Sequence, residues 1–149
     1  VLTVWEDVKR AERGNVEPES ILDKVPRSLP ALLRATEVQK KVAKVGFDWD
    51  GVAPIVDKIE EELREVEAAL HDGCEDKIDE EIGDLLFAVV NLARFRKRSN
   101  AEDMLLRAVK KFERRFRFVE SELKKRGTFG KASLEEMDAV WNEAKRRGL

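Results

Sequence analysis

The sequence has few of the residues that carry reactive chemistry or covalent cross-links: one cysteine, one histidine and no tyrosine among 149 residues. The single cysteine, Cys74, excludes an internal disulfide framework and fits the reducing cytoplasm, where we expect the protein to act. It has no base nearby in sequence to activate it. His71 lies in a predicted turn beside Asp72. We therefore interpret both Cys74 and His71 as surface or loop residues rather than catalytic ones.

Long apolar segments and a strong net charge are also missing. No apolar run approaches the roughly 20 residues that a bilayer span requires, and no signal peptide opens the chain, so we expect no membrane partner. The net charge is −2, with acidic and basic residues interleaved, which is typical of a solvated surface. Nucleic-acid binding through the segment 107–117 is disfavoured by this acidity and by the intervening glutamates.

The residues that are abundant favour helices. Apolar residues make up 42% of the chain and charged residues 40%, and the length suits one domain with a substantial core. No strand pattern is found. We therefore predict an all-α fold, a helical bundle of about five to six helices completed by homodimerisation. Periodicity and capping signals place the helices over residues 3–13, 28–46, 52–73, 75–98, 101–126 and from 133 to beyond 144.

Prolines divide the chain into two parts. Residues 1–27, with Pro18 and Pro26, are predicted to be a short helix and a wrapping segment that could link two domains, and residues 28–149 form the functional domain. The chain begins at Val1 without methionine, so we interpret it as a fragment of a longer protein or as a one-domain relative of such proteins.

Four carboxylates are predicted to meet between two helices. At about 100° per residue, Glu62 lies at the edge of the apolar stripe of its helix and Glu65 about 60° further round. Glu81 and Asp84 occupy the corresponding positions on the next helix. A connection of only a few residues favours antiparallel neighbours, and packing the two stripes together would gather the four groups.

Asp84 strengthens the case for a metal site. It precedes an apolar run, residues 85–90, which is predicted to be buried and to form part of a dimer interface. Clustered carboxylates repel one another unless a cation joins them. Since no histidine or thiolate belongs to the cluster, Mg²⁺ is the expected ion and Mn²⁺ a substitute. A buried salt-bridge network with the basic helix, or an ordinary solvated surface, is the alternative interpretation.

Further residues have the chemistry that a nucleotide requires. Lys110 and Arg114, one turn apart, would bind phosphate oxygens, although surface charge is the simpler interpretation. Asn91 lies two turns beyond Asp84, on nearly the same face, where its amide could meet a nucleobase edge or backbone. Trp141, four residues before Lys145, either stacks on a base or packs the last helix.

These residues sit in segments that resemble the MazG family of nucleoside triphosphate pyrophosphohydrolases. The metal motif of that family is matched by two adjacent glutamates, a third after two residues, and Glu-x-x-Asp on the next helix. The likeness covers most of the chain and points to the second, catalytic half of the two-domain MazG proteins. The matching segments are 29–35, 45–49, 61–65, 80–87, 90–94 and 111–116.

The resemblance implies an all-α homodimer that cleaves a nucleoside triphosphate to its monophosphate and pyrophosphate, with broad base tolerance. It places metal ligation on the four carboxylates named above, and it implies that the family's first domain is missing from this chain. Contacts to phosphates and nearby charge carry over onto Lys77, Glu80, Lys110 and Arg114, and a C-terminal pair near the substrate onto Trp141 and Lys145.

The predicted mechanism is metal-assisted attack of water on the α-phosphorus, with pyrophosphate as the leaving group. Glu61 or Glu80, each next to a predicted ligand, would orient or deprotonate the water. The expected role is removal of unwanted nucleotides or control of the nucleotide pool. The competing hypothesis is a non-catalytic helical dimer that binds metal and nucleotide as a sensor or an interaction module.

Overall fold

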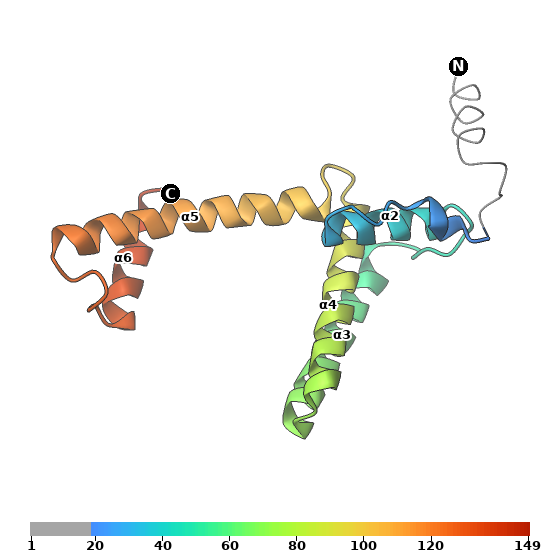
Figure 1. Ribbon diagram of the computed structural model, residues 1–149, viewed down its shortest axis with the longest axis horizontal. Coiled ribbons are helices and arrows are strands. Elements are labelled where there is room, and N and C mark those ends of the chain that lie inside the picture. The colour runs from blue at the N-terminus through green and yellow to red at the C-terminus, as the bar shows by residue number, and fades with distance from the viewer. Residues whose placement is uncertain (1–18) are drawn as a thin grey trace, which may run out of the picture. The chain divides into compact units, whose positions relative to one another are not determined.

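The computed structural model describes residues 19–149, and these residues form helices and loops without a strand (Figure 1). The all-α prediction is thus confirmed for the described part of the chain, while the helix predicted over residues 3–13 lies outside it. One short 3₁₀ helix precedes five α-helices. Their bounds are η1 Ile21–Lys24, α2 Ala31–Ala43, α3 Val52–Asp72, α4 Glu75–Phe95, α5 Ala101–Lys125 and α6 Leu134–Arg146.

Capping residues explain three of the helix boundaries. Gly73 ends α3 in the left-handed conformation, at φ 71°, which glycine adopts without steric cost. Asn100 accepts a hydrogen bond from the backbone N–H of Asp103 and so begins α5. At the start of α6, Ser133 and Glu136 form the predicted capping box.

Three predicted boundaries are displaced. Helix α4 was predicted to continue to residue 98 but ends at Phe95, because the backbone turns at Lys97, which adopts a positive φ of 57°. Helix α2 begins at Ala31 instead of residue 28, since Pro30 takes the N-cap position with extended ψ, and it ends at Ala43 instead of residue 46. None of these changes affects the residues predicted to form the site.

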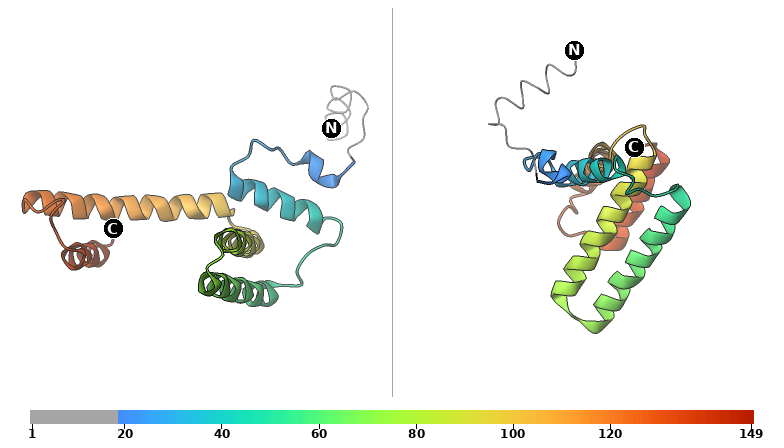
Figure 2. Two further views of the ribbon diagram at one scale, coloured as in Figure 1. Left: turned by 60° about the horizontal axis from the view of Figure 1, so that its bottom comes forward. Right: turned by 90° about the vertical axis from the view of Figure 1, so that its right-hand side faces the viewer.

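The chain divides into two compact units, one ending at Arg96 and the other comprising Lys97–Leu149. In the first unit, α3 and α4 pack side by side as an antiparallel hairpin, and α2 packs against α4 (Figure 2). The buried residues between these helices include Ile55, Val66, Ala69 and Val90. Since α3 and α4 pack along their length, side chains in the middle of the hairpin face each other.

In the second unit, α5 packs against α6. The core of the second unit consists of Val119, Leu123 and Val140, with Trp141 partly buried against it. The guanidinium of Arg115 donates a hydrogen bond to the carbonyl of Leu149, which ties the end of the chain to α5. None of the helices between residues 19 and 149 combines the length and apolar character that crossing a bilayer requires.

Much of the predicted apolar stripe does not pack within this chain. On α3 the buried positions are Ile55, Glu62, Val66 and Ala69, whereas Leu63 and Leu70 are exposed. The packed face of α3 is therefore centred on Glu62, which the sequence had placed at the edge of the stripe. The apolar run 85–90 was predicted to be buried and to form part of a dimer interface, and in the single chain Leu86, Phe87 and Val89 are exposed on α4.

Candidate functional site

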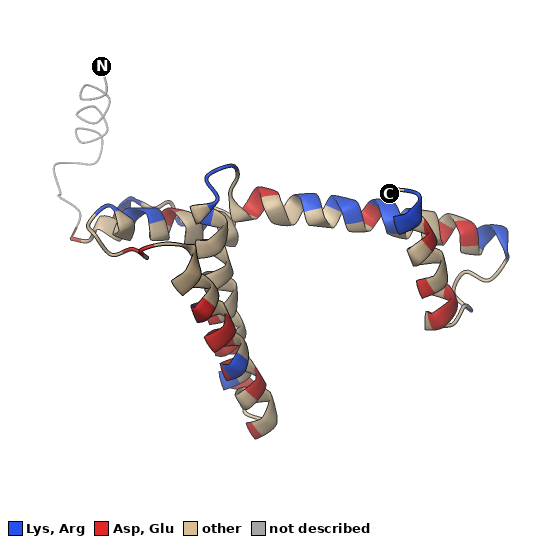
Figure 3. Cartoon of the chain, turned by 180° about the vertical axis from the view of Figure 1, so that it is seen from behind, with Lys and Arg blue, Asp and Glu red and all other residues tan. Residues whose placement is uncertain are grey.

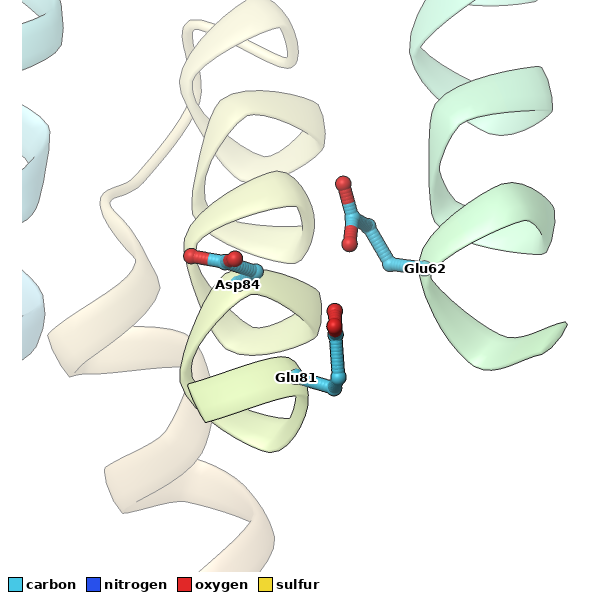
Figure 4. Close-up of side chains that lie close together, drawn as sticks. All are labelled: Glu62, Glu81 and Asp84. Carbon is cyan, nitrogen blue, oxygen red and sulfur yellow. The ribbon is translucent and has the colours of Figure 1, made fainter. Parts of the chain in front are cut away.

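Three carboxylates converge between α3 and α4. Glu62, Glu81 and Asp84 each offer an oxygen, and these oxygens lie within 4.8 Å of one another. Figure 4 shows Glu62 reaching from α3 toward α4 while Glu81 rises between the two helices. Glu62 is 6% exposed and Glu81 7%, whereas Asp84 is exposed to solvent. The cluster is thus closed by protein on one side and open at Asp84.

Glu65 is the fourth carboxylate of this group. Burial raises the pKa of Glu81 most, and the charge and hydrogen bond of Glu65 raise it further. Asp84 acts in the same direction, while Lys77 lowers the pKa of Glu81. The structure thus gathers three of the four predicted metal residues in one cluster, and the fourth, Glu65, lies close enough to Glu81 to raise its pKa. An oxygen-only donor set with excess negative charge suits a hard divalent cation.

Lys58 balances part of this charge and was not predicted from the sequence. Its ammonium lies 2.5 Å from an oxygen of Glu62 and 2.9 Å from one of Glu61, and these contacts raise its pKa. The spacing in the sequence could have predicted these ion pairs, because Glu61 and Glu62 follow Lys58 by three and four residues on one helix face. Figure 3 shows mostly acidic positions on this hairpin, with a few basic positions among them.

A cavity of about 530 Å³ adjoins the carboxylates. Its volume lies in the range of small-molecule sites, and its walls combine apolar and aromatic surface with a few polar groups. The carboxylates Glu62 and Asp84 line the cavity together with Lys58. The remaining lining residues are Gly46, Phe47, Asp48, Trp49, Ile55, Phe87, Ala88 and Asn91.

A polar network braces the wall of the cavity where Asn91 lies. The guanidinium of Arg94, whose side chain is 12% exposed, donates to both carboxylate oxygens of Asp48. The same guanidinium donates to Oδ1 of Asn91 from Nη2 at 3.0 Å and from Nε at 3.3 Å. The hydrogen bonds from Arg94 lower the pKa of Asp48 most, and the Trp49 N–H contributes as well. Asp48 and Arg94 lie in the segments that carry the resemblance, but no spacing or periodicity in the sequence links them.

The other predicted substrate and catalytic residues fall into two groups. Glu61 and Lys77 line a second hollow together with Glu65 on the α3–α4 hairpin, and Glu80 is exposed on α4. Lys110 and Arg114 are exposed on α5, and Lys145 is exposed on α6, so these three residues belong to the second unit.

Trp141 packs within the second unit. Its ring lies 5.1 Å from that of Phe112, and the guanidinium of Arg115 lies 5.8 Å from its centroid. These contacts agree with the packing interpretation of Trp141. They leave its predicted contact with substrate as a prediction.

Comparison with known proteins agrees with this geometry. Residues 51–119 match the family described as the MazG nucleotide pyrophosphohydrolase domain, a span that holds all four carboxylates and Asn91. The chain is 48% identical over 152 residues to a protein of Escherichia coli (strain K12) named nucleoside triphosphate pyrophosphohydrolase, covering 100% of this chain and 57% of that protein.

Two further relatives extend the comparison. The nucleoside triphosphate pyrophosphohydrolase/pyrophosphatase MazG of Thermotoga maritima is 37% identical, over 95% of this chain and 54% of its own length. The protein YabN of Bacillus subtilis (strain 168) is 46% identical, over 97% of this chain and 30% of its own length. The chain thus spans little more than half the length of the E. coli and T. maritima relatives.

Proposed function

Because the chain belongs to the MazG family, we propose that it hydrolyses nucleoside triphosphates to nucleoside monophosphate and pyrophosphate with the help of a divalent ion. The observation that carries this proposal is the cluster of Glu62, Glu81 and Asp84 beside a cavity of nucleotide size. Carboxylates and aromatic side chains line the same cavity, and a nucleotide offers phosphates to a metal and a flat base to aromatic rings.

The proposed ligands of the ion are Glu62, Glu65, Glu81 and Asp84. Mg²⁺, or Mn²⁺ in its place, supplies when bound the positive charge that offsets the carboxylates and the phosphate oxygens. Lys58 already neutralises Glu62 in the chain, and Lys77 lies close enough to Glu81 to lower its pKa. Both ammonium groups lie beside the carboxylate cluster, and we propose that they also contact phosphate oxygens there.

The remaining roles follow from where side chains lie. Glu61 and Glu80 are proposed to orient the water that attacks the α-phosphorus. Of the two, Glu61 is held by its ion pair with Lys58. Lys110 and Arg114 are proposed to bind the departing pyrophosphate, because guanidinium and ammonium groups match phosphate oxygens.

We also propose that the chain forms a homodimer. The support is the apolar surface that the single chain leaves open on α3, α4 and α5. The proposed role in the cell is removal of unwanted nucleotides or control of the nucleotide pool in the cytoplasm.

Product analysis tests the activity directly. We expect each of ATP, GTP, CTP and UTP, incubated with the chain and Mg²⁺, to yield its monophosphate and one pyrophosphate, separated by anion-exchange chromatography. Release of orthophosphate and a nucleoside diphosphate would place the attack at another phosphorus and contradict the mechanism. Tight binding of unchanged nucleotide would show a sensor instead of an enzyme.

A second prediction concerns pH and stability without metal. The pKa of Glu81 is raised in the folded chain, so its protonation stabilises the fold below the unfolded pKa of 4.5, and this contribution is lost as pH rises through the folded pKa. Glu81→Gln should therefore raise the melting temperature in EDTA at pH 7.5 relative to wild type, with no such gain at pH 4.

Mg²⁺ should reverse the order of the melting temperatures of wild type and Glu81→Gln. Mg²⁺ at a hundredfold excess over its Kd stabilises a folded site by about 2.7 kcal/mol, and Glu81→Gln should lose most of that gain. The exposed Glu67 on α3 provides a matched control, and Glu67→Gln should respond to Mg²⁺ as wild type does. An equal Mg²⁺ response in Glu81→Gln would contradict the assignment of Glu81 as a ligand.

A further inference from the structure

Arg94 fixes the orientation of the Asn91 amide. A guanidinium carries only donors, so the atom of Asn91 that lies 3.0 Å from Nη2 and 3.3 Å from Nε has to be the carbonyl oxygen. The reverse orientation would set two donors against each other. Asp48 holds Arg94 in turn, through bonds to both of its carboxylate oxygens. The amide orientation is thus set by chemistry and not by an arbitrary choice between oxygen and nitrogen.

This leaves the NH₂ group of Asn91 as its free polar group. Asn91 lines the cavity, and no group of residues 19–149 accepts a hydrogen bond from its Nδ2. A donor on a largely apolar wall costs free energy unless a ligand or water accepts from it. Asn91 therefore favours a ligand that places a hydrogen-bond acceptor against this wall of the cavity.

The surroundings of Asn91 suit a base. Phe47, Trp49 and Phe87 line the same cavity and offer flat surfaces for stacking. Asp84 lies seven residues before Asn91 on α4, which is about 10 Å along a helix at 1.5 Å per residue. That is the scale on which a ribose separates a phosphate from its base. With phosphates at Asp84, the base would reach the level of Asn91.

We propose that Asn91, oriented by Arg94 and Asp48, donates a hydrogen bond to the acceptor that every base carries beside its glycosidic bond, O2 in pyrimidines and N3 in purines. These two atoms occupy equivalent places, which is why the minor-groove edge of DNA distinguishes bases poorly. A single donor at this position would hold any of the four bases. This inference rests on the proposed function, since it assumes that the cavity receives the nucleoside.

Purine analogues test the contact atom by atom. In wild type, kcat/KM for 3-deaza-ATP should be about tenfold below that for ATP, because the amide donor of Asn91 then loses its acceptor. The value for 7-deaza-ATP should equal that for ATP. Asn91→Ala should lower kcat/KM for ATP and abolish the difference between ATP and 3-deaza-ATP.

Replacing the amide donor of Asn91 by an acceptor gives a second, independent test. Asn91→Asp presents an acceptor to the base, and guanine is the one base with a donor, its 2-amino group, on this edge. The ratio of kcat/KM for GTP to that for ATP should rise by about tenfold in Asn91→Asp. General effects of the added charge on phosphate or metal cancel in this ratio.

The positioning roles of Arg94 and Asp48 have their own test. Arg94→Gln and Asp48→Ala should both shrink the tenfold penalty of 3-deaza-ATP, because the amide is then free to turn. Arg96→Gln, an exposed arginine two residues away, should keep the full penalty. If Arg94 and Asp48 only support the fold, their variants should lower kcat/KM equally for ATP and 3-deaza-ATP and leave the ratio of the two values unchanged.

The outcomes separate this inference from the proposed function. Equal kcat/KM for ATP and 3-deaza-ATP in wild type, or a penalty on 7-deaza-ATP instead, overturns the assigned contact while hydrolysis of ATP still stands. If no pyrophosphate forms from ATP, the activity fails. Calorimetric Kd values for the α,β-methylene forms of the same nucleotides then still decide the contact, with a tenfold difference supporting it and equality overturning it.

Discussion

Asp84→Asn is expected to lower pyrophosphate release from ATP by about a thousandfold at saturating Mg²⁺. Metal ligation and charge neutralisation at a phosphoryl centre contribute several kcal/mol to the transition state, and each 1.36 kcal/mol is a factor of ten in rate. An amide keeps the shape of the side chain but removes its negative charge. The rate should be measured in single turnovers, with product followed by a pyrophosphate-coupled assay.

The fold should survive this substitution. Asp84 is exposed, and it contributes repulsion to Glu81 in the metal-free chain, so its neutralisation relieves the cluster. Helical circular dichroism and the melting temperature in EDTA should equal or exceed those of wild type. Asp79→Asn, an exposed position on the same helix, is the matched control and should retain the wild-type rate. Near-normal turnover by Asp84→Asn would contradict a role of the carboxylate cluster in the mechanism.

Asp84 gives a cleaner test than Glu62, although both were predicted as ligands. Glu62 is buried and paired with Lys58, so removing it also releases an ammonium group inside the hairpin. Breaking such a pair destabilises a protein in its own right. A loss of activity in Glu62→Ala would mix the two effects, whereas Asp84 separates chemistry from stability.

Helical phase alone was enough to predict the gathering of the carboxylates. Two Glu-x-x-acid pairs on helices joined by a short turn have few ways to pack, and an antiparallel hairpin brings their flanks together. The same reasoning misjudged the position of Glu62, which lies in the packed face. A stripe that is wider than one contact surface cannot reveal which part of it faces the partner helix, since both parts are equally apolar.

The bracing network could not be predicted in the same way. Asp48 lies in the loop before α3, and Arg94 lies 46 residues later on α4. Their contact depends on how the loop folds back over the cavity, and periodicity carries no information about that. Lys58 is a different case, because its i+3 and i+4 partners could be read from the sequence once the glutamates had been singled out.

The apolar surface of α5 leads to the second large expected effect. Leu105 is 53% exposed and Phe112 58%, and Leu106, Val109 and Phe116 on the same helix are exposed as well. A contiguous set of large apolar side chains on a soluble chain marks an interaction surface. In the proposed homodimer this surface is buried between the two copies.

Leu105→Asp should convert the dimer to a monomer. A carboxylate stranded in an apolar interface without a partner costs about 3–5 kcal/mol, which raises the Kd of dimerisation by at least about a hundredfold. Leu105 is preferred to Phe112, because Phe112 packs against Trp141 and its replacement would also disturb the core of the second unit. Light scattering after size exclusion, over a range of protein concentrations, gives the mass directly.

The control needs the same new charge on the opposite side of α5. Arg107 is exposed and lies two residues after Leu105, which at about 100° per residue places it some 200° round the helix, away from the apolar stripe. Arg107→Asp should therefore keep the wild-type mass. A Leu105→Asp protein with native circular dichroism and an unchanged dimer mass would show that this surface faces something other than a second copy. A wild-type chain that stays monomeric at all concentrations would contradict the homodimer itself.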